Sequence, residues 1–397
     1  MAGRVVVTGA GVISPIAAGY EEFEQALYRG ESGSKPSDRF QGATVAEVSG
    51  FEAQRWLGNK GIRVLDRGAR MLCVAAQMAL ANQGLAEDGG PEVGMVCGTM
   101  FGSVHSIVSF DWSGLTEGPS YVNPMEFPNT VINSASGQAA IRYHLRGMNS
   151  SICSGFASSL YALHYAAECL RFGRARVLLA GGAEELCDES LQGFLRTGMM
   201  SPSGCARPFG ADRDGTVPGE GSAMWVVESE ESAAGRGAAP WLEICGFGAR
   251  QEAQGLQHYS PRAEAAGDAI HMALAASSIA PEQVACVVAS AGGSREGDAM
   301  EAAALRSVFG SRMDTLPVFA PKAALGEALG ASGAFAAMAA GLALRRGSLP
   351  PTAGCGPVEY GMRVSPEPQP VEGEFALVNA FGCDGNCAAL VLRLWKN

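Results

Sequence analysis

The stretch from Gly147 to Gly173 constrains the fold more than any other part of the chain. It predicts a short strand, a tight turn of small residues and then a helix, because Leu160, Leu163 and Leu170 recur at helical spacing. Turns of this kind carry the nucleophile of many enzymes, since the side chain projects outward and the helix N-terminus supplies positive potential and free N–H groups. The first question is whether this elbow, residues 147–173, still carries a nucleophile.

Composition excludes several classes of function. The chain has 29 basic and 40 acidic residues, a net charge of −11, with no long run of either sign, which argues against a nucleic-acid or anionic-membrane surface. Its 11 cysteines are scattered, mostly in apolar segments, as expected of buried thiols in a reducing compartment rather than a disulfide framework. The apolar run Val5–Val7 is too short for a signal peptide or a membrane span. We therefore expect a cytoplasmic protein.

Strand and helix patterns alternate through two halves of the chain. Residues 231–240, with Gly and Pro among small and charged residues, suggest a boundary, which gives an N-terminal half, 1–238, and a C-terminal half, 239–397. Residues 93–98 and 284–291 each predict a strand ending in small residues, a weak sign of internal duplication. The pattern predicts a layered α/β fold in which helices cover and separate largely parallel sheets.

Three local motifs suggest ligand sites but are incomplete. Gly9-Ala10-Gly11 after a strand lacks the third glycine of a dinucleotide fingerprint, and Pro15 interrupts the helix start. The segment 212–215, with sequence DRDG, lacks the later ligands of a calcium loop. Cys383 and Cys387 have no second Cys/His pair nearby. No cofactor and no metal is expected.

Motifs along nearly the whole chain, in order, resemble the β-ketoacyl synthases of the thiolase-like fold. The resemblance implies two related halves in an αβαβα arrangement. It rests on the segments at residues 5–15, 128–129, 137–138, 180–184, 207–209, 212–215, 219–221, 297–298, 322–331 and 379–382.

Active members of that family carry an elbow cysteine and two histidines, and this chain lacks all three at the matching positions. Ungapped matching of the elbow places Phe156 at the nucleophile position, and the two histidine positions hold Ser290 and Glu327. The five histidines, His105, His144, His164, His258 and His271, all precede residue 272, so no shift of register restores the pair. Cys153, three residues before Phe156, stays open as a catalytic thiol or a small buried residue.

Loss of these groups resembles the chain-length factor, or ketosynthase β subunit, of type II polyketide synthases. The resemblance implies a non-catalytic subunit that pairs with an active ketosynthase subunit, acts on chains bound to acyl carrier protein, and closes a shared tunnel that sets chain length. Two alternatives stay open: an acyltransferase or thioesterase-like enzyme that uses Cys153 or Glu327, and a scaffold that binds acyl carrier protein without sharing a tunnel.

Two further sets of residues follow from the resemblance. The segment after residue 98 runs along the dimer interface in the family, so the tunnel or interface candidates are Met100, Phe101, His105, Ile107, Phe110 and Trp112. Lys322, one of only four lysines, sits among alanines and leucines, and we interpret it as the structural partner of Glu327 or of another buried carboxylate. The loop Gly382–Asn386 departs from the family's gating loop, which puts ordinary acyl gating in doubt.

Overall fold

A mixed sheet of ten strands is the frame of the molecule. The computed structural model describes residues 3–81, 85, 90, 92–253, 255 and 258–396. Across the sheet the order is β10 (Val318–Phe319), β9 (Val284–Val288), β13 (Phe375–Phe381), β14 (Asn386–Leu394), β8 (Leu242–Gln251), β1 (Val5–Ile13), β7 (Gly221–Ser229), β6 (Val177–Glu184), β4 (Val93–Gly98) and β5 (Asn149–Ile152).

The strand order repeats itself outward from the centre. β1 and β8, the first strands of the two halves, pair antiparallel at the middle, and the other strands follow in equivalent order on each side. The expectation of largely parallel sheets is wrong, because β7 and β14 run antiparallel to both of their neighbours. Only the outer strands of each half pair parallel, β6–β4–β5 and β13–β9–β10. In each half, a strand from later in the sequence, β7 or β14, lies between the first strand and the parallel set. Sequence periodicity alone does not show where in a sheet a strand inserts.

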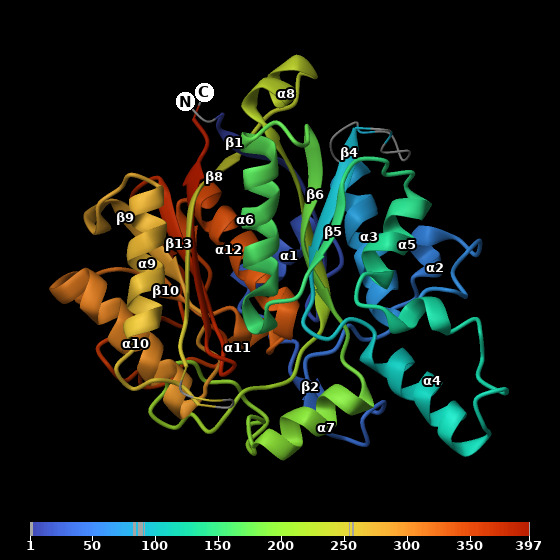
Figure 1. Ribbon diagram of the computed structural model, residues 1–397. Helices are drawn as coiled ribbons and strands as arrows, with labels where there is room; N and C mark the ends of the chain where they lie inside the picture. The colour runs from blue at the N-terminus through green and yellow to red at the C-terminus, as the bar shows by residue number, and fades with distance from the viewer. Residues whose placement is uncertain are drawn as a thin grey trace.

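Helices form three layers around the two halves of the sheet, so the predicted αβαβα arrangement is confirmed (Figure 1). α3 (Arg67–Ala81) and α5 (Ser134–Arg142) cover one outer face, and α9 (Glu264–Ala276) and α10 (Arg295–Phe309) cover the other. α6 (Ser158–Arg171) and α12 (Ser332–Arg346) lie between the halves. Every α12 residue from Ser332 to Leu344 is buried, which suits a helix of Ala, Gly, Leu, Met and Phe that is apolar all round.

The remaining helices and strands lie around these layers. They are α1 (Tyr20–Tyr28), β2 (Lys35–Pro36), β3 (Thr44–Val45), α2 (Gln54–Leu57), α4 (Val104–Thr116), α7 (Asp188–Thr197), α8 (Glu230–Gly235), α11 (Lys322–Leu325), β11 (Ser348–Leu349) and β12 (Gln369–Pro370), with short 3-10 turns. Helix α4 projects from the layers at the lower right of Figure 1, and none of its residues is buried. No helix in the described part of the chain has the length and apolar character needed to cross a membrane.

The first strand differs from its predicted form. β1 does not end at its glycines but continues through them to Ile13, paired with β7. A Cβ on Gly11 would overlap the Ala75 carbonyl of α3, so this glycine permits close packing of helix on sheet rather than a phosphate turn. Helix α8 occupies part of the predicted boundary segment, and the division at residues 238/239 stays a prediction.

Candidate functional site

The elbow has the predicted strand–turn–helix form. β5 ends at Ile152, a single 3-10 turn spans Gly155–Ala157, and α6 begins at Ser158. Gly155 has φ +57°, a left-handed conformation that glycine adopts without strain. The Ser158 hydroxyl donates to the Gly155 carbonyl at 2.6 Å and accepts from the Ser154 N–H at 2.9 Å, so the turn is held from both sides.

Phe156 follows the turn glycine and is buried, with 5% of its surface exposed. Its ring belongs to a small apolar cluster with Phe194, Leu329 and Cys383, against which Met100 and Met199 pack. An aromatic ring has no group that can attack a thioester. At this position the elbow therefore contributes packing and no nucleophile.

Cys153 lies on the strand side of the turn and is exposed. Its thiol donates to the Met100 carbonyl at 3.1 Å. Partial burial and the nearby Glu184 carboxylate raise the pKa of Cys153, whereas a nucleophilic cysteine needs a lowered pKa to populate the thiolate. Cys153 is thus in the wrong electrostatic setting for thioester exchange.

The two other positions of interest meet around Lys322. The Lys322 ammonium lies 2.6 Å from Glu327 Oε2 and 3.4 Å from the Ser290 hydroxyl. Glu327 Oε1 also accepts from the Leu329 N–H at 2.9 Å and the Ser332 hydroxyl at 2.7 Å. Every polar atom of the Glu327 side chain is therefore paired inside the protein.

Ser290 is bound to the backbone of the neighbouring strand. Its hydroxyl accepts from the Phe381 N–H at 2.9 Å and donates to the Phe381 carbonyl at 3.1 Å. A hydroxyl held in this way replaces no catalytic imidazole, because it has no proton to accept or give near neutral pH. Ser290 joins β9 to β13 at the edge of the site.

Sequence reasoning missed Glu301, a buried carboxyl on α10. Glu301 Oε1 accepts from the Ser290 N–H at 2.9 Å and the Asn379 amide at 2.8 Å, and Oε2 has no partner among the described residues. Burial raises the pKa of Glu301 to about 7, offset in part by these hydrogen bonds. Its position three residues after Asp298, on one helix face, was the available signal.

The loop Gly382–Asn386 carries a second carboxylate against the elbow. Asp384 Oδ2 accepts from the Phe156 N–H at 3.4 Å and the Asn386 amide at 3.0 Å, and Oδ1 accepts from the Asn386 N–H at 3.1 Å. A Cβ on Gly155 would overlap this carboxylate. Asp384 thus places a carboxylate, held by three hydrogen bonds, at the start of the elbow helix.

Two neighbouring hollows share the side chain of Cys383. A cavity of about 300 Å³ is lined by Ser290, Glu301, Lys322 and Glu327 among others. An apolar groove of about 420 Å³, which we call the Phe156 groove, is lined by Met100, Phe101, Val104, Phe156, Glu189, Ser190, Gly193, Phe194, Thr197, Met199, Leu329, Cys383 and Asp384. Thr197, Met199 and Cys383 face both hollows, so these side chains form the partition between them.

The structure separates the six tunnel or interface candidates. Met100 and Phe101 line the Phe156 groove. The other four lie on α4 outside it. His105 is exposed and pairs with Glu189 at 3.1 Å, Phe110 packs against Phe127 with ring centroids 5.9 Å apart, Ile107 is half-buried and Trp112 is exposed.

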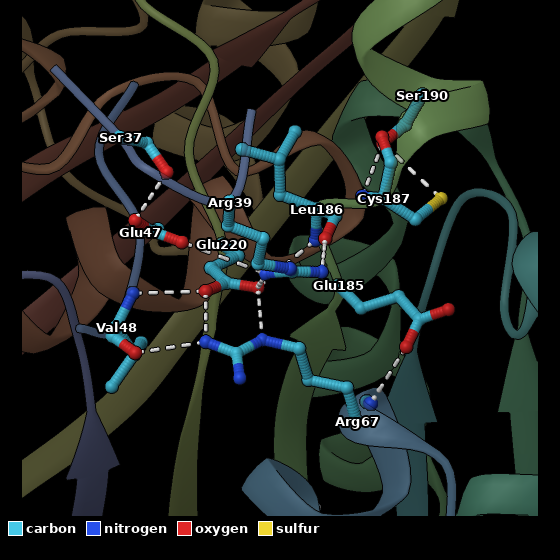
Figure 2. A network of polar contacts seen from close by, with 11 residues as sticks. Ser37, Arg39, Glu47, Val48, Arg67, Glu185, Leu186, Cys187, Ser190 and Glu220 are labelled. Carbon is cyan, nitrogen blue, oxygen red and sulfur yellow. Dashed lines mark hydrogen bonds and ion pairs between the residues drawn. The ribbon is translucent and has the colours of Figure 1, made fainter. Parts of the chain in front are cut away.

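A buried glutamate fixes the start of α7, the helix that forms one wall of the groove (Figure 2). Glu220 forms a two-pronged ion pair with Arg67, at 2.6 and 2.8 Å, and accepts from the Leu186 N–H at 3.1 Å. Ser190 then holds the Cys187 N–H at 2.9 Å at the N-terminus of the helix. The Gly219-Glu220-Gly221 motif therefore acts as architecture.

No metal centre is evident in the part of the chain that the structure describes. No group of three or more His, Cys, Asp or Glu side chains there could hold an ion. In the segment 212–215, Asp214 is instead bonded to the hydroxyls of Ser201 at 2.6 Å and Ser203 at 3.1 Å, as in a structural turn.

Two family models together match most of the chain, and known proteins resemble it along nearly its full length. Residues 2–233 match the family "Beta-ketoacyl synthase, N-terminal domain" and residues 242–356 match "Beta-ketoacyl synthase, C-terminal domain". The chain is 33% identical to 3-oxoacyl-[acyl-carrier-protein] synthase 2 of Coxiella burnetii, with 98% of each chain covered, and 30% identical to the Rhizobium meliloti protein of the same name, again with 98% of each covered.

Solved structures also superpose on the chain along its full length. The ishigamide ketosynthase/chain length factor superposes with a TM-score of 0.92 at 30% identity, with both chains covered in full. A chain of a second solved structure, of a type II PKS acyl-carrier protein in complex with its ketosynthase bound to the hexaketide, superposes with a TM-score of 0.89 at 25% identity, also over both chains in full.

Proposed function

Since the chain belongs to the β-ketoacyl synthase family, we propose that it is the non-catalytic, chain-length-determining subunit of a ketosynthase heterodimer. The observation that carries the proposal is the elbow itself. The fold that mounts a nucleophile is retained, yet its tip is the buried ring of Phe156, and the Phe156 N–H donates to the carboxylate of Asp384. The partner subunit then supplies the cysteine and both histidines.

The retained polar groups support a structural role. Lys322 and Glu327 neutralise each other at 2.6 Å, and Leu329 and Ser332 donate to the other carboxylate oxygen of Glu327. A buried carboxylate with a structural role needs partners of this kind. The raised pKa of Cys153 and the ion pair between Glu327 and Lys322 weigh against the alternative of an altered enzyme that uses either residue.

An exposed apolar face supports a protein partner. Monomeric proteins seldom expose so many large apolar side chains in one region. The region comprises α4 and the segments on either side of it, from residue 101 to residue 132. Its exposed members are Phe101, Val108, Trp112, Leu115, Tyr121, Met125, Phe127, Val131 and Ile132.

Phe101 lies both on this face and in the Phe156 groove, so a partner seated on α4 would cover the mouth of the groove. A wall built from two chains sets product length by exclusion, since each unit beyond the available volume overpacks the tunnel at about 1–3 kcal/mol. The carrier-protein complex among the structural neighbours supports acyl carrier protein as the second partner.

Co-expression with a tagged ketosynthase subunit that keeps its cysteine and both histidines tests the proposal. We expect the two chains to purify at one-to-one. Trp112→Asp should lower the yield of complex at least tenfold, because it places a charge in the centre of a desolvated interface.

Phe172→Asp is the matched control, since Phe172 is equally exposed, at 71% against 65% for Trp112, but lies at the end of α6. It should leave the yield unchanged. Co-purification with acyl carrier protein but not with the co-expressed ketosynthase subunit would favour the scaffold alternative instead.

A further inference from the structure

We propose that the Phe156 groove receives a reduced, hydrocarbon-like acyl chain, such as a polyene, and discriminates against a chain with a ketone at alternate carbons. The inference rests on the proposed function, in which the partner's growing chain extends toward this subunit. It adds the substrate class, which the family relationship leaves open.

The wall of the groove is apolar over most of its length. Thioether and aromatic side chains dominate and offer dispersion contacts to an extended hydrocarbon. The apolar members include Met100, Phe101, Phe156, Phe194, Met199 and Leu329.

The few hydroxyl groups in the wall already donate hydrogen bonds within the protein. The Ser190 hydroxyl donates to the Cys187 carbonyl at 3.0 Å, and the Thr197 hydroxyl donates to the Gly193 carbonyl at 2.8 Å. The Cys383 thiol is directed at the sulfur of Met199 at 3.9 Å. None of these groups remains to donate to a substrate carbonyl.

Three of the backbone N–H groups at the groove also have acceptors within the protein. The N–H groups of Met100 and Phe101 go to Glu184, at 2.6 and 3.0 Å, and the Leu329 N–H goes to Glu327. The two acidic side chains of the wall, Glu189 and Asp384, accept hydrogen bonds and repel a carbonyl oxygen when ionised.

A ketone placed here loses its hydrogen bonds to water without replacement. Each unpaired carbonyl should weaken binding by roughly tenfold, about 1.4 kcal/mol. A carbon–carbon double bond carries no such penalty. The chemistry of the wall therefore favours a chain whose ketones have been removed.

Such a chain requires two reactions between elongation cycles. The β-ketone takes up a hydride from a reduced nicotinamide on a separate reductase, and a proton from solvent, to give an alcohol. A dehydratase then removes water to leave a carbon–carbon double bond. These are the reaction classes that must supply the substrate.

The test uses the full-length chain and two pantetheine amides of equal length, decanoyl and 5,9-dioxodecanoyl, with binding measured by calorimetry. Both ketones of the second amide lie on odd-numbered carbons, as in an unreduced polyketide chain. We expect the diketone to bind roughly 100-fold more weakly. Met100→Gln, which introduces an amide donor of similar size, should reduce that ratio by roughly tenfold. Met272→Gln, at an exposed methionine on α9 outside the groove, should leave it unchanged.

Equal affinity for the two amides, binding of neither, or no effect of Met100→Gln overturns the inference. Co-purification with the ketosynthase subunit is unaffected by these outcomes. A failure here is therefore distinguishable from a failure of the proposed function.

Discussion

Removal of the Lys322 ammonium should strongly destabilise the fold without affecting any chemistry of this chain. The side chains of Lys322 and Glu327 are only 9% and 6% exposed, and their charged atoms lie 2.6 Å apart. Lys322→Met leaves a buried carboxylate without its counter-ion. Breaking a buried pair in this way costs about 3–5 kcal/mol, and we expect the lower end because Leu329 and Ser332 still donate to Glu327.

The double variant Lys322→Met/Glu327→Gln separates charge from packing. The amide oxygen of glutamine keeps the hydrogen bonds from Leu329 and Ser332, and no net charge remains buried. We therefore expect the double variant to recover to within about 1 kcal/mol of the unaltered protein.

Urea unfolding followed by both tryptophan fluorescence and far-UV circular dichroism measures these differences. Free energies are compared only if the two traces coincide, because a chain of 397 residues can unfold through intermediates. A loss below about 1 kcal/mol for the single variant, or a double variant no better than the single, would refute a structural role for the ion pair.

Three further predictions follow from buried groups and from α4. Burial raises the pKa of Glu185 from 4.5 to about 8, so the folded state favours the neutral carboxyl. The protein is therefore most stable below pH 4.5, and its free energy of unfolding falls as pH rises to about 8. Glu185→Gln should flatten this loss of about 1.4 kcal/mol per pH unit in thermal unfolding, and an unchanged pH profile would contradict it. Asp384→Ala should release the loop Gly382–Asn386 and speed iodoacetamide labelling of Cys383 at least tenfold, with buried Cys73 as internal control. Equal labelling rates in the variant and the unaltered protein would show that Asp384 does not fix this loop. Val104→Ala in the assembled complex should lengthen the products, because Val104 is a residue of α4 that lines the Phe156 groove, and an unchanged product length would remove α4 from the tunnel wall.

The elbow could be predicted from the sequence because its signals are local. Small residues at the turn, apolar residues at helical spacing and a glycine stop all lie within 27 positions, Gly147 to Gly173, and each acts on its own segment. The assignment of Phe156 to the nucleophile position came from the resemblance to the family, by matching the elbow without a gap.

Other features depend on contacts between distant segments. The pairing of β7 with β1 and β6, and of β14 with β8 and β13, joins strands that are far apart along the chain, so sequence periodicity gave parallel sheets where the structure is mixed. Glu301 and Asp384 acquire their roles only because α10 and the loop 382–386 converge on the site. A burial-raised pKa has no sequence signature.

Helix α4 shows a third kind of limit. Its apolar residues, taken alone, could be core or interface, and helical spacing does not distinguish the two. Only the structure shows that none of them is buried in the isolated chain.

The intact mass of each subunit, after the one-to-one complex is incubated with an acyl-loaded acyl carrier protein, tests the central claim most directly. We predict that the ketosynthase subunit gains one acyl group on its cysteine while this chain keeps its unmodified mass, because Phe156 cannot form a thioester and Cys153 has a raised pKa. An acyl adduct on this chain, at Cys153 or any other residue, that turns over into product would contradict the account.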